Sequence, residues 1–253
     1  MSQLPEPVNS SEQMADELFA VVALLDGQPG LRNALSDPTA SAEVRKQLAT
    51  DVFGHQISAD TLAALAQAVA QRWGSGAALV DALERQGVRV LLDVSQREGR
   101  LDEVEDELFR FSRIVASDDA LRVALDDRNA ELRSRETLVR DLLDGKADPV
   151  TATLAVRAVA ARHRTYVATL EDILALAAQA QQRAVAHVTV AAPLTDDQKG
   201  RLQQTLATQA GRPVTMAVTV DPSVLGGVRV RIGDELIDGT VGARLEAAKR
   251  QLN

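Results

Sequence analysis

The chain has 253 residues, which is enough for two or three domains with ordinary cores, and it carries a net charge of −8. The acidic balance argues against binding to nucleic acid, and the lack of cysteine excludes disulfides, thiolate metal sites and cysteine nucleophiles. Hydrophobic residues make up 45% of the chain but aromatic residues only 2%, which favours closely packed helices built from Ala, Leu and Val.

The first three quarters of the chain carry helical patterns. Residues 1–11 hold two prolines and several small polar residues, so a disordered lead-in is expected there. A further helix is predicted at 88–97, and another from Thr165 to about His187, because no Gly or Pro interrupts that run. Before these, apolar residues recur at helical spacing in three groups: Leu18, Val22 and Leu25; Val44, Leu48 and Val52; and Leu62, Leu65, Val69 and Trp73.

Part of this pattern occurs twice, with an offset of 90 residues. Glu17-Leu18-Phe19 returns as Glu107-Leu108-Phe109, and Arg45 returns as Arg135. One offset shared over the whole stretch indicates an internal duplication of a helical bundle. We therefore expect a partial extra bundle at 12–83 and a second bundle at 84–186. The counterpart of the helix at 88–97 would fall on Pro5 and Pro7, so the first bundle is expected to expose one apolar face.

From His187 onwards the pattern changes from helical spacing to the alternation of half-buried strands. Thr195 to Gln198 has the spacing of a capping box, which predicts the start of a helix that ends near Ala210. The predicted strands lie at 187–190, 214–220, 228–232 and 236–237, and a closing helix is predicted from Thr240. The expected fold is mostly α with a small α+β C-terminal domain: tandem antiparallel helical bundles followed by a β-α-β-β-α domain at 187–253.

A long stretch near the end of the chain is the most distinctive. Gly226-Gly227 opens no helix and no Lys-Ser/Thr follows it, so a structural turn is favoured over a phosphate-binding loop. In order and spacing, the stretch resembles the C-terminal signature of the delta subunit family of F-type ATP synthases. The residues that carry the resemblance are Asp221, Gly226, Gly227, Gly233, Asp234, Ile237, Asp238, Gly239, Thr240, Arg244 and Leu245.

The run from Val88 to Leu108 also resembles the opening of that family, so the resemblance covers roughly residues 84–253 and leaves 12–83 as an extra part. It implies a non-catalytic stator subunit, present once per complex, in which the helical bundle binds the alpha subunits of the catalytic head and the C-terminal domain binds the b subunit of the stalk. It further implies a peripheral location at the cytoplasmic face of the cell membrane, with membrane association only through the complex. A helical adaptor or regulator unrelated to energy coupling is the alternative.

Two groups of side chains are candidates for partner contact. The acidic run 102–107 has two interpretations, and a solvated helix face is favoured over docking to a basic partner. The other candidate is a groove between the helices beginning near 88 and 150, where small side chains would admit an alpha-subunit helix. Its residues are Val88, Leu91, Leu92, Ala152, Ala155 and Val159. The histidines lack the neighbours of a metal site, and neither a cofactor nor catalysis is expected.

Overall fold

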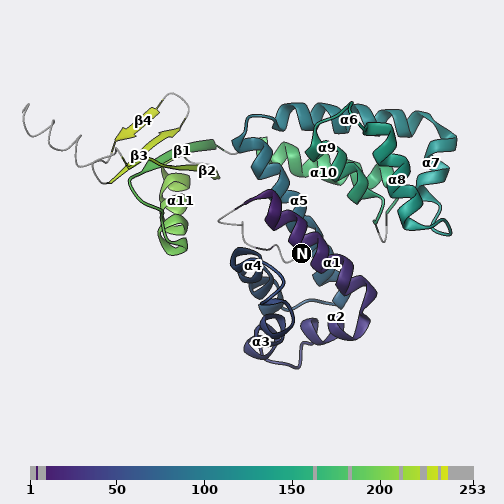
Figure 1. The fold of residues 1–253 in the computed structure, drawn as a ribbon, viewed down its shortest axis with the longest axis horizontal. Coiled ribbons are helices and arrows are strands. Elements are labelled where there is room, and N and C mark those ends of the chain that lie inside the picture. The colour runs from purple at the N-terminus through teal and green to yellow at the C-terminus, as the bar shows by residue number, and fades with distance from the viewer. Residues whose placement is uncertain are drawn as a thin grey trace, which may run out of the picture.

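The computed structural model describes residues 4, 10–161, 164–181, 184–210, 213–222, 227–232 and 235–238. Within these residues the chain is mostly helical and has a small mixed sheet near its end (Figure 1). The helices are α1 (Glu12–Gly27), α2 (Pro29–Ser36), α3 (Ala42–Phe53), α4 (Ala59–Ala70), α5 (Gly76–Arg97), α6 (Leu101–Ser117), α7 (Asp119–Asp126), α8 (Leu132–Leu143), α9 (Pro149–Ala158), α10 (Tyr166–Gln181) and α11 (Asp196–Ala210). The strands are β1 (Ala184–Val190), β2 (Val214–Val220), β3 (Val228–Ile232) and β4 (Glu235–Asp238).

Serine residues cap the N-termini of four of the first five helices. Each hydroxyl accepts a hydrogen bond from a backbone N–H in the first turn, which satisfies a group that has no partner inside the helix. These residues are Ser11, Ser41, Ser58 and Ser75. The capping box predicted ahead of α11 is confirmed, because the backbone N–H of Thr195 donates to Gln198 Oε1 (2.9 Å) and that of Gln198 donates to Thr195 Oγ1 (3.3 Å).

Equivalent contacts occur 90 residues apart in the two helical groups, α1–α5 and α6–α10. The carboxylate of Glu17 accepts from the backbone N–H of Ser58 (2.9 Å) where α4 begins. Where α9 begins, Glu107 accepts in the same way from Asp148 (2.9 Å). Paired contacts of this kind are expected when one ancestral bundle has been duplicated. We call α1–α5 the first repeat and α6–α10 the second repeat.

Helix α5 connects the two repeats. It runs without a break through the domain boundary predicted between residues 83 and 84, because no helix-stopping signal occurs there. It packs against α1 and α2 of the first repeat and against α6 and α10 of the second, and Figure 1 shows α1 lying along it. The buried side chains of both repeats therefore belong to one continuous hydrophobic core.

Two expectations for the first repeat are wrong. The predicted apolar stripe of α3 is wrong at Val44, which is 60% exposed; Leu48 and Val52 pack against the core as predicted, beside the buried Arg45, Ala49 and Phe53. The expected exposed apolar face is also not found: Val44 is the only large hydrophobic side chain that is exposed between residues 10 and 83, all of which the structure describes. The physical reason is that α5 packs along α1 and covers the bundle.

The last described part of the chain has its own small core. The sheet order is β2-β1-β3-β4, with β1 parallel to β2 and antiparallel to β3, and α11 packs against β2. The helix predicted to reach His187 ends at Gln181 instead, because Ala186, Val188 and Val190 point alternately into this second core from a strand. The short return strand is confirmed as β4. The closing helix predicted from Thr240 lies outside the described residues.

Candidate partner-binding surfaces

The signature residues that the structure describes are turn and pairing residues. Gly227 has φ of 86°, a conformation that strains any residue with a Cβ, so a glycine is required where the chain enters β3. The backbone N–H of Asp221 donates to the carbonyl of Val190 (2.8 Å), which ties the end of β2 to β1. Ile237 and Asp238 stand opposite Val230 and Arg229 in the sheet. Gly226, Gly233, Asp234, Gly239, Thr240, Arg244 and Leu245 lie outside the described residues.

The predicted groove between α5 and α9 is not open. Its side chains belong to the core of the chain or pack against it: Val88, Leu91, Leu92, Ala155 and Val159 are each at most 4% exposed, and Ala152 is half-buried. Tyr166, at the start of α10, seals the same region, and its hydroxyl donates to the carbonyl of Ala155 (2.9 Å). Burial raises the pKa of the Tyr166 hydroxyl well above its ordinary value. Small residues on α9 therefore admit the chain's own helices.

One cluster joins α9 to α1 and α5. The guanidinium of Arg157 lies over the ring of Phe19, 4.5 Å from its centroid, and donates to both carboxylate oxygens of Glu84 (3.1 and 2.7 Å). The side chains of Arg157 and Glu84 are only 19% and 22% exposed, so the interaction is partly shielded from solvent. Cation–π and bidentate contacts of this kind favour arginine over lysine. The sequence contains no local signal for the cluster, because its members are far apart along the chain.

Exposed hydrophobic side chains concentrate on the second repeat. Among the described residues, those of α6–α8 that are large, apolar and exposed are Phe109 (55%), Ile114 (56%), Val123 (66%), Leu132 (42%) and Leu142 (36%). Sequence reasoning missed them, although Phe109 lies directly after the buried Leu108 and so had to be on another face of α6.

The acidic side chains of residues 102–107 on α6 lie in different environments. Asp106 pairs with Arg110 (2.8 Å), and Asp102 accepts from the side-chain amide of Gln181 (2.9 Å). One carboxylate oxygen of Glu105, Oε2, is shielded from solvent and has no hydrogen-bond partner among the described residues. Burial, and next the charge on Asp102, raise the pKa of Glu105 above its ordinary value. A purely solvated face does not account for Glu105.

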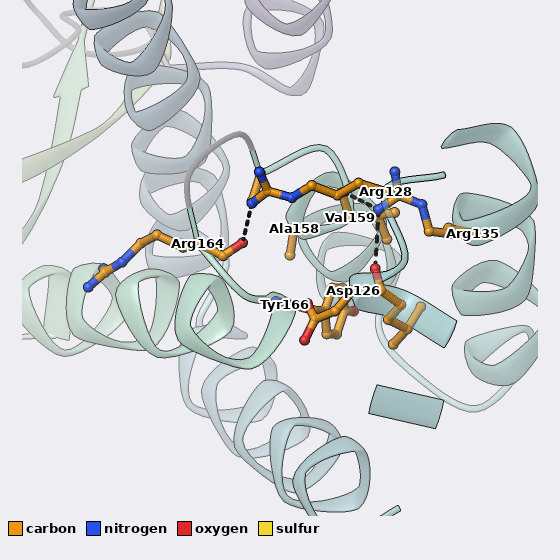
Figure 2. A pocket seen from close by; sticks show the side chains of 9 residues that line it. Asp126, Arg128, Arg135, Ala158, Val159, Arg164 and Tyr166 are labelled. Atoms are coloured by element: carbon orange, nitrogen blue, oxygen red, sulfur yellow. Dashed lines mark hydrogen bonds between the residues drawn. The ribbon is translucent and has the colours of Figure 1, made fainter. Parts of the chain in front are cut away.

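A small hollow lies where α7, α9 and α10 meet (Figure 2). The space open to a water-sized molecule is about 10 Å³, which is about enough for one water and far below the roughly 300–1,000 Å³ of small-molecule sites. Figure 2 shows that the Arg164 side chain points away from it, where it pairs with Asp172, while Arg128 donates to the Arg164 carbonyl (3.5 Å). Asp126 accepts from the backbone N–H of Tyr166 (2.7 Å). The polar groups satisfy the backbone and do not converge on a reacting atom.

The hollow reflects a difference between the repeats. In the first repeat the guanidinium of Arg45 donates to five backbone carbonyls, including Val69 at 2.6 Å, and fills this position. In the second repeat, the described residues that accept from Arg135 are the carbonyls of Leu125 (3.1 Å) and Val159 (3.4 Å), and its Nε has no hydrogen-bond partner among them. We conclude that the hollow is the incompletely filled counterpart of a structural arginine site.

Two further features bear on function. Within the described part of the chain, no three His, Asp or Glu side chains are placed to hold a metal ion. His55 and His187 are exposed, and His163 is outside that part. No helix of the described residues combines the length and the apolar character needed to cross a membrane.

The chain is similar to known proteins of one family. Residues 88–252 match the family model described as ATP synthase delta (OSCP) subunit. The chain is 47% identical to the ATP synthase subunit delta of Streptomyces avermitilis over 241 residues, which is 95% of this chain and 88% of that protein. It is 44% identical to the ATP synthase subunit delta of Nocardia farcinica, with 93% of this chain and 88% of that protein covered. A chain of the Toxoplasma gondii mitochondrial ATP synthase hexamer is similar at 19% identity, with a TM-score of 0.28 and with 65% of this chain and 94% of that chain covered.

Proposed function

Because the chain belongs to the ATP synthase delta (OSCP) subunit family, we propose that it is a stator subunit of the F-type proton-transporting ATP synthase. It links the catalytic head to the peripheral stalk and prevents the head from turning with the rotor, so that proton flow is coupled to ATP synthesis. The observation that carries this proposal is the match of nearly the whole chain, at 47% identity over 241 residues, to a protein named as this subunit. The role is structural and requires neither a cofactor nor a catalytic residue.

The physical character of the chain supports a role in bearing load. A stator must resist torque without dissociating, which requires affinities near nanomolar, or about 12 kcal/mol. Helices that pack through aliphatic and aromatic anchors reach such affinities without catalytic groups. The continuous helix α5, which shares its core with both repeats, and the exposed hydrophobic side chains of the second repeat fit this role.

Each part of the chain has a proposed partner. The second repeat, within residues 84–186, binds the alpha subunits at the top of the head, and residues 187–253 bind the b subunit of the stalk. One copy serves each complex, at the cytoplasmic face of the cell membrane, and is held there by the other subunits. The extra helices at 12–83, after a lead-in at 1–11, stiffen the connection by packing on α5.

Reconstitution tests the proposal. A catalytic head assembled without this subunit is mixed with the purified chain and with the soluble part of the b subunit, and the products are separated by size. We expect one chain per head and a ternary complex that forms only when the chain is present. A chain that binds neither the head nor the b subunit would refute the proposal and favour the alternative of an unrelated helical adaptor.

A further inference from the structure

Helix α5 serves both repeats. With the offset of 90 residues, the last helix of the second repeat, α10, corresponds to residues 76–91, which make up most of α5. Helix α5 then continues to Arg97 and packs against α6 and α10 of the second repeat. The orientation of one repeat relative to the other therefore depends on whether α5 stays straight.

Gly87 is the position at which α5 bends most easily. Glycine restrains a helix less than any other residue, because its backbone has more accessible conformations without a Cβ. The corresponding residue of α10 is Ala177, so this glycine belongs to the helix that joins the repeats and not to the duplicated pattern. The space beside Gly87 is filled from outside the helix, since a Cβ there would lie 2.4 Å from the Phe19 ring of α1.

Arg157 connects the second repeat to this part of α5. From α9, its guanidinium lies 4.5 Å from the centroid of the Phe19 ring and donates to both carboxylate oxygens of Glu84 (3.1 and 2.7 Å). Glu84 precedes Gly87 by three residues in α5, so the two residues lie on one face of the helix. One side chain of the second repeat thus contacts both α1 and α5 beside the glycine.

The cluster of Arg157, Phe19 and Glu84 is an addition to the duplicated pattern. With the offset of 90 residues, Arg157 corresponds to Gln67 and Glu84 corresponds to Leu174, so the ion pair forms between the repeats and has no equivalent within either. Its side chains are 19% and 22% exposed, and a bidentate pair that is partly shielded from solvent is stronger than an exposed one. A contact of this kind acts on the position of one repeat relative to the other.

We propose that Arg157 prevents α5 from bending at Gly87 and so holds the two repeats in one fixed orientation. Its contact with Phe19 keeps α1 packed against the glycine, and its pairing with Glu84 keeps α9 beside the same turn of α5. Without these two contacts α5 bends at Gly87, and the repeats change their relative position. The inference goes beyond the proposed function and does not depend on it, because it concerns the free chain.

Distances between pairs of spin labels on the full chain test this inference, and the chain has no cysteine of its own that would interfere with labelling. The first pair is attached through Val44→Cys in α3 and Val123→Cys in α7, which are 60% and 66% exposed and lie in different repeats. The second pair is attached through Ala77→Cys and Gln96→Cys, on either side of Gly87 in α5. Pulsed electron paramagnetic resonance should give one narrow distance distribution for each pair when Arg157 and its partners are intact.

Loss of the contacts should change both distributions. Arg157→Ala should broaden the distribution of the first pair or add a second population, and should shift the pair on α5 to shorter distances. Glu84→Gln should act in the same direction but more weakly, because the contact between Arg157 and Phe19 remains. The matched control is Arg110→Ala, which breaks an exposed pair with Asp106 inside the second repeat (side chains 64% and 62% exposed) and should leave both distributions unchanged.

Several results would overturn the inference. Distributions that are the same in the wild type, Arg157→Ala and Glu84→Gln would show that the cluster does not set the orientation, as would an equal change in Arg110→Ala. A change between the repeats with unchanged distances along α5 would show that the helix does not bend at Gly87. Circular dichroism separates bending from unfolding: every variant should keep the helix content of the wild type, and loss of helicity in Arg157→Ala and Glu84→Gln would mean that the cluster is needed for folding and not for orientation.

Discussion

The ring of Phe19 occupies the space that a side chain at Gly87 would need, since a Cβ built at Gly87 would come within 2.4 Å of the ring carbon Cε1. This contact brings α1 and α5 close together and lets Arg157 cover the other side of the ring. One glycine in the middle of a 22-residue helix thus determines how closely α1 and α5 pack within the first repeat. Gly87 stabilises the fold through this packing and not through helix propensity, because glycine in a helix interior is unfavourable by roughly 0.5–1 kcal/mol relative to alanine.

Replacing Gly87 with alanine should therefore destabilise the helical part by about 1–3 kcal/mol through overpacking, despite the better helix propensity of alanine. The measurement is urea unfolding followed by circular dichroism. The matched control is Gly30→Ala in α2, where a Cβ would meet no atom within 4 Å. The control should be neutral or slightly stabilising. A Gly87→Ala protein as stable as its control would show that Phe19 moves aside at no cost.

Arg157→Ala should lower the free energy of unfolding by about 1–2 kcal/mol, because it removes a partly shielded ion pair and a cation–π contact together. A double-mutant cycle with Glu84→Gln isolates the coupling between the two side chains. The control is Arg122→Ala, which breaks an exposed pair with Asp119 (side chains 45% and 86% exposed) and should cost less than about 0.5 kcal/mol. Additive effects of Arg157→Ala and Glu84→Gln would contradict a coupled cluster.

Glu17 predicts a pH dependence in the acid range. Burial alone would raise the pKa of Glu17, but hydrogen bonds from Ser58, Thr61 and Gln13 outweigh it and lower the pKa from 4.5 to about 2. A carboxyl group whose pKa is lower in the folded state stabilises the fold above its unfolded pKa, and this contribution disappears as the pH falls through the folded pKa. The stability that Glu17 adds should thus be complete above about pH 4.5 and lost progressively towards pH 2.

Unfolding of wild type and Glu17→Gln across this range checks the prediction. We expect the wild type to be more stable by about 1–2 kcal/mol at neutral pH, in line with the loss of a helix cap. The difference should shrink as the pH is lowered from 4.5 towards 2. A difference that stays constant over that range would mean that the hydrogen bonds to Ser58 and Thr61 do not depend on the charge of Glu17.

Removing residues 184–253 should leave a folded helical protein that still binds the catalytic head but no longer binds the b subunit. The reason is that the strands and α11 have their own core, separate from the core of α1–α10. Helicity, cooperative unfolding and affinity for each partner are the measurements. Full affinity of the shortened chain for the b subunit would show that the proposed assignment of partners is incorrect.

Gly227→Val should destabilise the sheet region by about 1–3 kcal/mol, because a β-branched side chain is strained at φ of 86°. The helical part should keep its unfolding temperature, and affinity for the b subunit should fall. Val228→Ile, one residue later in β3, serves as a control that leaves the turn glycine in place. Unchanged unfolding of both parts would mean that the chain turns there without needing positive φ.

Local signals in the sequence determined many of the helix starts, several strands and the internal repeat. Serine caps mark the starts of helices, and the capping box at Thr195 marks the start of α11. The alternation of apolar residues located β2 and β3, and the offset of 90 residues relates the hydrogen bonds of Glu17 and Glu107. These features depend on neighbours within a few turns or on repetition, so they can be read along the chain.

Which side chains are buried was decided only by the tertiary structure. The small side chains at Ala152 and Ala155 suggested a groove for a partner, but α9 packs them into the chain's own core, so Ala155→Trp would disrupt the fold and would not report on partner binding. The same tripeptide, Glu-Leu-Phe, places a buried ring at Phe19 and an exposed ring at Phe109. The difference depends on Gly87 and Ala177, nearly 70 residues away from each ring, and on Arg157 across the shared helix α5. A pattern of apolar residues predicts that a side chain needs cover, but only the tertiary structure decides whether the chain itself provides that cover, because the contacts are made between segments whose separation the local pattern does not encode.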